Sequence, residues 1–171
     1  MRAVRVLSFV VGAATILLTA AAEAQPKPTT TVVAQHDAPV TISSYTAQYR
    51  ERSQYAAEGV HHSVKYQNSS GRTIVAIQFG LATFDVWNEF LNRTNGIALE
   101  TVTGGRSQSG TWIANPLRAF TFLTGVAWVS KVRFEDGEIW TADEKTVLEA
   151  LRAIEADFDA ARLKPEPPPG G

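Results

Sequence analysis

The chain has 171 residues, with 16 basic and 17 acidic side chains, a net charge of −1, and no cysteine. This balance gives no electrostatic case for nucleic-acid binding, which needs a clustered basic surface. The lack of cysteine excludes disulfides, thiol catalysis and a lipid-modified cysteine. The length suits one domain that is stabilised by burial and hydrogen bonding alone.

The first residues carry the three parts of a secretory signal. Arg2 and Arg5 precede an uncharged apolar run, and Ala22-Glu23-Ala24 provides the small-x-small pattern of a cleavage site. We predict a signal peptide over residues 1–24, cleaved after Ala24, and a periplasmic or secreted bacterial protein. The alternative is an uncleaved anchor, but the run is short for a bilayer span of about 20 residues. We therefore expect no stable membrane insertion after cleavage.

Two segments are predicted to flank the folded domain. Residues 25–39 hold three prolines and three consecutive threonines, which favour a flexible linker. Residues 164–171 are almost entirely proline and glycine, which predicts a disordered tail. The folded part is expected to cover residues 40–163.

Strict alternation predicts two long strands around the turn-prone residues 68–71. The apolar positions of the two strands are Val60, Val64, Tyr66, Val75, Ile77, Phe79 and Leu81. The turn between alternating runs predicts a β-hairpin. The apolar set then changes parity to Phe84 and Val86, which predicts a bulge over residues 80–83. Residues 88–93 are ambiguous and could form a helical turn.

A later segment repeats this pattern. Residues 126–134 alternate, Asp136-Gly137 is a strong hairpin turn signal, and Ile139 begins the return strand. Weaker strands are expected over residues 40–49, 98–102, 109–113 and 118–123. Seven or eight short strands at this spacing predict an antiparallel β-sandwich of the immunoglobulin-like kind.

One α-helix is predicted at the carboxyl end. Thr141 and Glu144 form a capping box. An apolar stripe follows, made by Val147, Leu151, Ile154 and Phe158. We expect this stripe to pack on the sandwich, with Trp140 beneath the helix.

The chemistry-bearing residues do not form a recognisable catalytic or metal site. The three histidines are His36, His61 and His62, and neighbouring strand residues such as His61 and His62 point to opposite faces. His62 lies among apolar residues, which favours a hydrogen-bonded core histidine over a metal ligand. The pair Asp85 and Glu89 is better explained by turn geometry than by glycosidase chemistry. We predict no enzyme, no catalytic residue, no metal and no cofactor.

The four tryptophans raise the possibility of sugar binding, because sugars stack on exposed indoles. Trp128 belongs to an apolar strand face and should lie in the core. Trp87 and Trp112 are the two candidates for exposed binding residues, although tryptophan at such positions more often serves packing.

The stretch YQNSSGRTIVAIQFGLATFD, residues 66–85, resembles the central hairpin of small exported bacterial immunoglobulin-like domains of the FxLYD type. Those domains place an Asn-x-Ser-Gly-like turn before a long strand that ends in an aromatic-Asp pair. Phe79-Gly80-Leu81 begins like their motif, and Phe84-Asp85 follows two residues late. The resemblance implies a non-enzymatic envelope module and no catalytic residues.

The sequence therefore predicts an exported, non-enzymatic binding or structural module of the bacterial cell envelope. Its partner is expected to be another envelope protein or a glycan, and not nucleic acid. The alternative function is a carbohydrate-binding module that uses Trp87 or Trp112.

Overall fold

The computed structural model describes residues 26–164. The predicted signal peptide lies outside the described residues, as does the predicted tail after Lys164. Within them, no helix is long and apolar enough to cross a membrane. The elements in chain order are β1 (Thr29–Val32), β2 (Val40–Arg50), β3 (Gly59–Asn68), β4 (Ile74–Asp85), β5 (Phe90–Ala98), β6 (Ser107–Ala114), η1 (Ala119–Thr121), β7 (Phe122–Phe134), β8 (Ile139–Thr141), α1 (Glu144–Arg152) and η2 (Ala160–Leu163).

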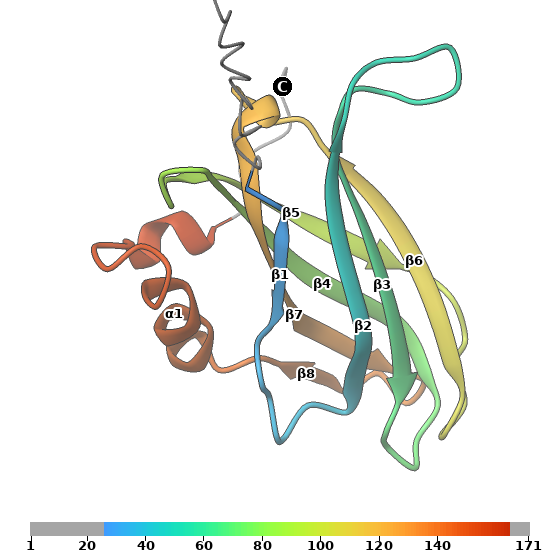
Figure 1. The fold of residues 1–171 in the computed structure, drawn as a ribbon. Helices are drawn as coiled ribbons and strands as arrows, with labels where there is room; N and C mark the ends of the chain where they lie inside the picture. The colour runs from blue at the N-terminus through green and yellow to red at the C-terminus, as the bar shows by residue number, and fades with distance from the viewer. Residues whose placement is uncertain (1–25, 165–171) are drawn as a thin grey trace, which may run out of the picture.

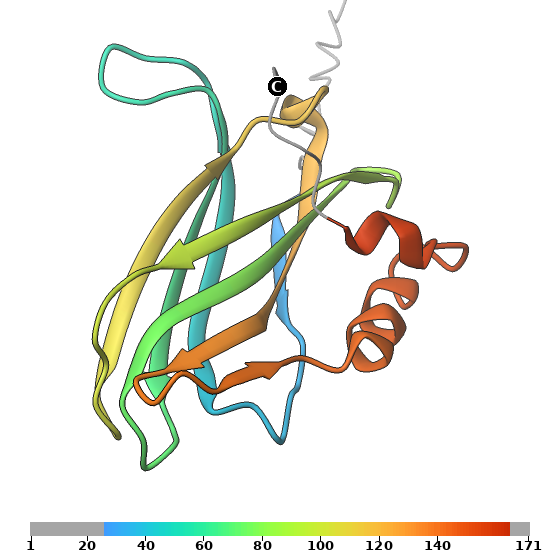
Figure 2. The same cartoon turned by 180° about the vertical axis from the view of Figure 1, so that it is seen from behind.

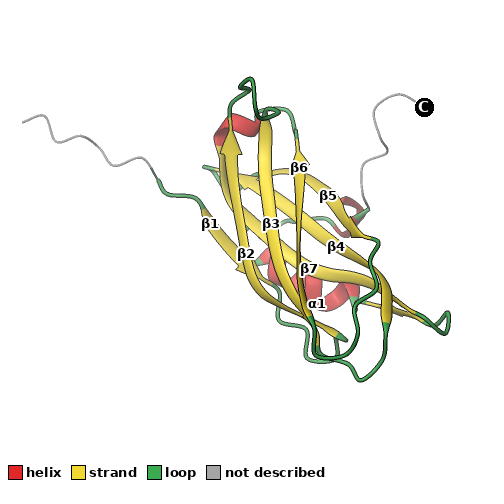
Figure 3. Ribbon diagram, turned by 90° about the vertical axis from the view of Figure 1, so that its right-hand side faces the viewer, coloured by secondary structure: helices red, strands yellow, loops and turns green. Residues whose placement is uncertain are grey.

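The strands form two packed sheets (Figure 1). The larger sheet has the order β1-β7-β4-β5, with β8 also paired to β7, and the smaller has the order β2-β3-β6. Strand β1 runs parallel to β7, and all other pairs are antiparallel. Seen from the side, the smaller sheet lies in front and α1 lies behind the larger sheet (Figure 3). The mainly β sandwich with one carboxyl-terminal α-helix is confirmed, whereas the immunoglobulin-like topology is not.

The larger sheet is covered on both faces. Its inner face packs against the smaller sheet around residues such as Tyr66, Phe79 and Leu81, which are all fully buried. Its outer face packs against α1 and the segment that follows (Figure 2). This second cluster contains Ala82, Phe84, Val126, Trp128, Val147, Leu151, Phe158 and Leu163. The change of apolar parity along β4 thus follows from burial on both faces. The register shifts fall at Ile74/Ala76, Gln78/Phe79, Thr83/Phe84 and Phe84/Asp85, so they flank the predicted residues 80–83.

The helix begins two residues later than the capping box predicts. Thr141 ends β8, and Asp143 is the N-cap, whose carboxylate accepts the amide N–H of Lys145 at 3.0 Å. The helix ends at Arg152, so Phe158 reaches the second cluster from the following segment. The predicted apolar stripe therefore packs on the sheet, but along a shorter helix. Trp140 does not lie beneath α1: it packs against the cluster between the sheets.

The predicted β3–β4 hairpin is wrong, because the two strands belong to different sheets. The turn between them is built around Asn68, which is fully buried. Its amide donates to the carbonyl oxygens of Arg72 and Val102, both at 2.7 Å, and its Oδ1 accepts the amide N–H of Ser70 at 3.0 Å. The local turn signal is correct, but this turn carries the chain from one sheet to the other.

The predicted linker over residues 25–39 contains packed structure. Strand β1 pairs with β7, and Val33 after it is buried. Gln35 then continues the pairing with its side chain: Nε2 donates to the Val129 carbonyl at 2.9 Å, and Oε1 accepts the Val129 N–H at 2.8 Å. These non-local bonds order a segment whose composition alone favours a flexible chain.

The remaining elements agree in part with the sequence predictions. The β7–β8 hairpin is confirmed, with Gly137 in its turn at a φ of 92° that favours glycine. Residues 90–98 form β5 and not a helical turn. Of the predicted strand 98–102, Ala98 ends β5 and Val102 forms an isolated bridge with Ile74. Residues 119–121 form η1, so β7 begins only at Phe122.

Candidate functional site

Four exposed apolar side chains lie on two adjoining connections, the β4–β5 turn and the β6–β7 connection. They are Val86, Trp87, Leu117 and Phe120, with exposed fractions of 39%, 67%, 91% and 69%. We call this set the aromatic tip. The amide N–H of Val86 donates to the carbonyl of Thr121 at 3.0 Å, so the two connections are joined through their backbones. The tip therefore presents apolar groups from two segments that lie about thirty residues apart in the chain.

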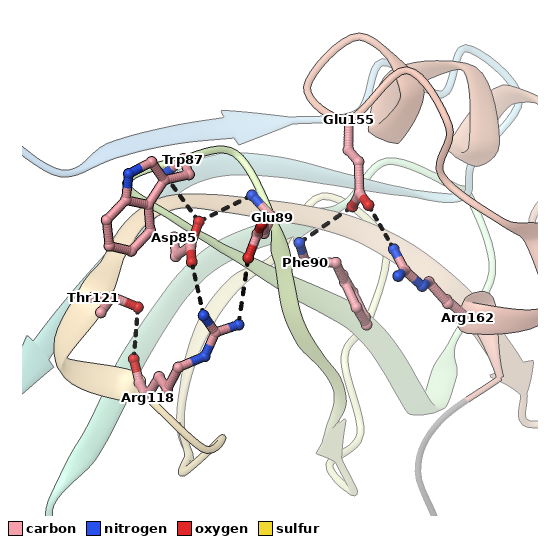
Figure 4. Close-up of polar contacts among 8 residues, drawn as sticks. All are labelled: Asp85, Trp87, Glu89, Phe90, Arg118, Thr121, Glu155 and Arg162. Atoms are coloured by element: carbon pink, nitrogen blue, oxygen red, sulfur yellow. Dashed lines mark hydrogen bonds and ion pairs between the residues drawn. The ribbon is translucent and has the colours of Figure 1, made fainter.

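The β4–β5 turn is organised by Asp85, whose side chain is fully buried. Its Oδ1 accepts the amide N–H groups of Trp87 at 2.9 Å and Glu89 at 3.0 Å (Figure 4). Asn88 adopts a left-handed φ of 63°, which asparagine tolerates in tight turns. The backbone at Trp87 is thus fixed by hydrogen bonds to a buried carboxylate.

Arg118 joins the second connection to this turn (Figure 4). Its guanidinium lies 3.7 Å from Asp85 Oδ2 and 3.6 Å from Glu89 Oε2. Its own backbone has a left-handed φ of 64°, and its carbonyl accepts both the N–H and the hydroxyl of Thr121, at 2.9 and 2.8 Å. Two carboxylates and one guanidinium therefore lie together at the turn whose backbone carries Trp87.

The far side of the turn is anchored to the carboxyl-terminal segment. Glu155 accepts the amide N–H of Phe90 at 3.2 Å and pairs with Arg162 at 2.7 Å. The Arg162 guanidinium also lies over the rings of Phe90 and Phe158, 5.5 and 5.8 Å from their centroids. The start of β5 is thereby fixed to the segment after α1, as Figure 4 shows for Glu155 and Arg162.

Removal of the Asp85 carboxylate tests how this turn is held. In Asp85→Ala, the N–H groups of Trp87 and Glu89 lose a charged acceptor, and we expect the free energy of unfolding to fall by about 2 kcal/mol. Hydrogen exchange at the amides of residues 87–89 should accelerate. Urea unfolding and exchange measured by NMR check both effects. Asp157→Ala, an exposed carboxylate without such bonds, is the matched control, and exchange that is equally slow in both variants would contradict the role of Asp85.

The two predicted binding tryptophans are not brought together. Trp87 is exposed at the tip, whereas Trp112 is half-buried and packs against Phe79, with ring centroids 5.5 Å apart. A Cβ at Gly96 or Gly110 would lie only 2.7 or 2.3 Å from the Trp112 indole. The indole occupies the space that these glycines leave open, so Trp112 packs within the fold, and it also lines a surface depression. Trp128 is 2% exposed, as predicted for a core residue.

The histidines lie where strand geometry places them. His62 faces the core, is 1% exposed, and shares a 2.9 Å hydrogen bond between its Nδ1 and the Tyr45 hydroxyl. Burial lowers its pKa to about 4, and the positive charge of His61 acts in the same direction. His61 lies on the other face of β3, with its Nε2 2.8 Å from the carbonyl of Ala57. Within residues 26–164, no three His, Asp or Glu side chains gather around a common point that could hold a metal.

A second surface feature lies on the smaller sheet, where a depression has a volume of about 780 Å³. Residues paired across antiparallel strands point to the same face. Three neighbouring rows contribute to the lining. They are Gln48, His61 and Ile113; Ala47, His62 and Trp112; and Thr46, Ser63 and Thr111. Hydroxyl, amide and imidazole groups therefore line this depression together with Trp112. The sugar-binding alternative stays a prediction, and Trp112 is the predicted binding tryptophan that lines this depression.

Comparison with known proteins shows the fold alone. No family model matches the chain, and no curated protein matches it. It is similar to the crystal structure of a hypothetical protein from Peptoclostridium difficile 630, with 10% identity and a TM-score of 0.52 over 73% of this chain and 100% of that one. A Northeast Structural Genomics Consortium target, SoR45, is 15% identical, with a TM-score of 0.38 over 61% of this chain and 80% of its own. The resemblance to FxLYD domains stays a prediction.

Sequence reasoning identified Trp87 but missed the residues around it. Leu117 and Phe120 follow Asn115-Pro116. This dipeptide predicts a turn, but it does not predict that the apolar side chains after it are exposed to solvent. Arg118 lies 33 residues from Asp85 in the chain, and nothing local links the two. The Asp85–Glu89 spacing was the one available signal, and turn geometry was its correct explanation.

Proposed function

We propose that the protein is an exported binding module without enzymatic activity, which binds another protein of the bacterial cell envelope through the aromatic tip. The observation that carries this proposal is the joint exposure of Trp87 and Phe120, at 67% and 69%, on connections joined by a backbone hydrogen bond. Exposed apolar groups that gather in one place, rather than singly, are typical of interaction surfaces.

The composition of the tip favours a protein partner. Tryptophan and arginine are enriched among the residues that dominate binding energy, and such residues are surrounded by groups that exclude water. Arg118 and Glu89 form an ion pair across the two connections that carry the tip, and they supply the polar rim of such a surface. A partner with an apolar pocket and a neighbouring charged group would complement both parts.

The rigidity of the tip supports the same function. A side chain that is already held in its binding position loses less conformational freedom on association. The buried Asp85 fixes the backbone at Trp87, and Arg118 ties the second connection to it. The tip is therefore pre-organised for binding before any partner arrives.

The arrangement of the histidines supports the non-enzymatic part of the proposal. A serine nucleophile needs an adjacent base. His62 is buried against Tyr45, and His61 points to the opposite face of β3. His36 lies in the turn after β1. The three imidazoles thus belong to separate places and do not act as one catalytic group.

The double variant Trp87→Ala/Phe120→Ala tests the proposal. Loss of a central anchor costs 2 kcal/mol or more in many interfaces, so we expect capture of the partner to weaken by roughly 30-fold. The measurement is affinity capture from envelope extract with the tagged full chain, followed by quantitative mass spectrometry and titration of the captured protein. The double variant should have the same urea midpoint of unfolding as the native chain, because both side chains are exposed.

Leu99→Ala/Ile139→Ala provides the matched control, since these side chains are 80% and 53% exposed elsewhere on the surface. Proteins lost with the tip variant and retained with the control are the expected partners. Identical captured sets from the native chain and the tip variant would overturn the proposal.

A further inference from the structure

A small pocket lies between the outer face of the larger sheet and the carboxyl-terminal segment, away from the aromatic tip. Its volume is about 200 Å³. Strand β5 contributes Arg93, the strands β4, β7 and β8 contribute Gln78, Lys131 and Thr141, and the carboxyl-terminal segment contributes Lys164. Gln78, Lys131 and Thr141 are register partners, so they form one row across three strands.

Arg93 is the unusual member of this pocket, because it is a buried cation. It is only 8% exposed, and no carboxylate of residues 26–164 lies within ion-pair distance of its guanidinium. Nη1 donates to the carbonyl of Leu163, while Nε has no hydrogen-bond partner in the described part of the chain. The guanidinium lies 5.4 Å from the ring centroid of Trp128. A buried charge without a counter-ion is unfavourable, so this position favours the arrival of an anion.

The charges around Arg93 add to this preference. Lys131 and Lys164 line the pocket as well, and Glu144 is its one acidic lining residue. Ser130, Thr141 and Gln78 add hydroxyl and amide groups that can donate further hydrogen bonds. Three cationic groups against one carboxylate leave the lining positive. The planar guanidinium matches the two oxygens of a carboxylate or phosphate group.

We propose that this pocket is a binding site for a small oxyanion, a carboxylate or a phosphate, with Arg93 as its main recognition group. The volume is below the range of about 300–1,000 Å³ that is usual for larger ligands, so the ligand has only a few non-hydrogen atoms. Lys131 and Lys164 attract the anion at the mouth, and Arg93 binds it at depth. This site is independent of the aromatic tip.

The test is a titration of the full chain with sodium acetate and with inorganic phosphate, at constant ionic strength maintained with sodium chloride. Trp128 reports binding through its fluorescence, because the Arg93 guanidinium lies over its ring. We expect a saturable change with at least one of the two anions. Arg93→Gln should weaken binding at least tenfold, and Lys131→Gln, which changes an exposed side chain, should weaken it several-fold. Trp128→Phe should abolish the fluorescence signal while calorimetry still detects binding.

Lys145→Gln is the matched control, because this exposed lysine of α1 lies outside the pocket lining. Binding that is weakened equally by Lys145→Gln and Lys131→Gln, or a response to acetate and phosphate no larger than that to chloride, would overturn the proposal. Partner capture by the aromatic tip is a separate measurement, so either proposal can fail alone.

Discussion

Replacement of Phe84 by alanine is expected to lower the free energy of unfolding by about 3–5 kcal/mol. Phe84 is fully buried on the helix side of the larger sheet. Its ring lies 5.7 Å from that of Phe90 and 6.2 Å from that of Phe158. The variant loses this buried area and leaves a cavity between β4 and the carboxyl-terminal segment, which the surrounding structure fills only in part.

Urea unfolding measures this effect directly. Phe120→Ala is the matched control: the same substitution at a 69% exposed position should change stability by less than about 0.5 kcal/mol. Amide exchange in α1 should accelerate in Phe84→Ala, because the helix packs on the same cluster. If both variants unfolded at the same urea concentration, the packing of the carboxyl-terminal segment on β4 would be incorrect.

Acidification is expected to destabilise the protein by about 3 kcal/mol between pH 6.5 and pH 4 through His62 alone. Burial disfavours the charged imidazolium and lowers the pKa of His62 from 6.5 to about 4. Above pH 6.5 the imidazole is neutral in the folded and unfolded states, and its contribution is constant. Between pH 6.5 and pH 4 the unfolded chain binds a proton that the folded chain does not. The free energy of unfolding therefore decreases as the pH is lowered through this range. Below pH 4 both states are protonated, and the loss is complete.

The effect of His62 on stability can be distinguished from that of the carboxylates, because the two occur in different pH ranges. Hydrogen bonds from Arg72 lower the pKa of Asp136, and the amide N–H of Lys145 lowers that of Asp143, both from an ordinary value of 3.8. Their contributions are therefore present above pH 3.8 and are lost only below it. Urea unfolding at several pH values, together with NMR titration of the His62 ring, measures the effect. His62→Gln should be less stable at pH 7 but should lack the decline between pH 6.5 and 4. An equally steep decline in that variant would contradict the prediction.

The sequence predicted the elements better than their partners. Alternation correctly indicated long strands, and Asp136-Gly137 correctly indicated the β7–β8 hairpin, because a short tight turn fixes the pairing of its own flanks. The same alternation occurs around Asn68, yet β3 and β4 enter different sheets. There the outcome depends on the bonds of Asn68 to Val102 and Arg106, which are distant in the chain. No local pattern contains that information.

Strand β1 escaped prediction for a related reason. Its residues Thr29–Val32 are exposed and lie in a threonine-rich segment with few large apolar groups. Their order comes from the edge of β7 and from the Gln35 side chain, not from their own preferences. The sequence also predicted only one part of the candidate site. The sequence offered Trp87, but the exposure of Leu117 and Phe120 depends on how the β6–β7 connection turns.

The pairing of β1 with β7 has a consequence for how the chain folds. The hydroxyls of Thr29 and Thr124 lie 3.1 Å apart, although 95 residues separate them. As the ribosome delivers the chain, β2 and β3 can pair early, but β1 and β4 lack their shared neighbour until β7 has emerged. Chains dominated by such distant pairings fold in roughly milliseconds to seconds. Most of the polypeptide is therefore synthesised before its larger sheet can close.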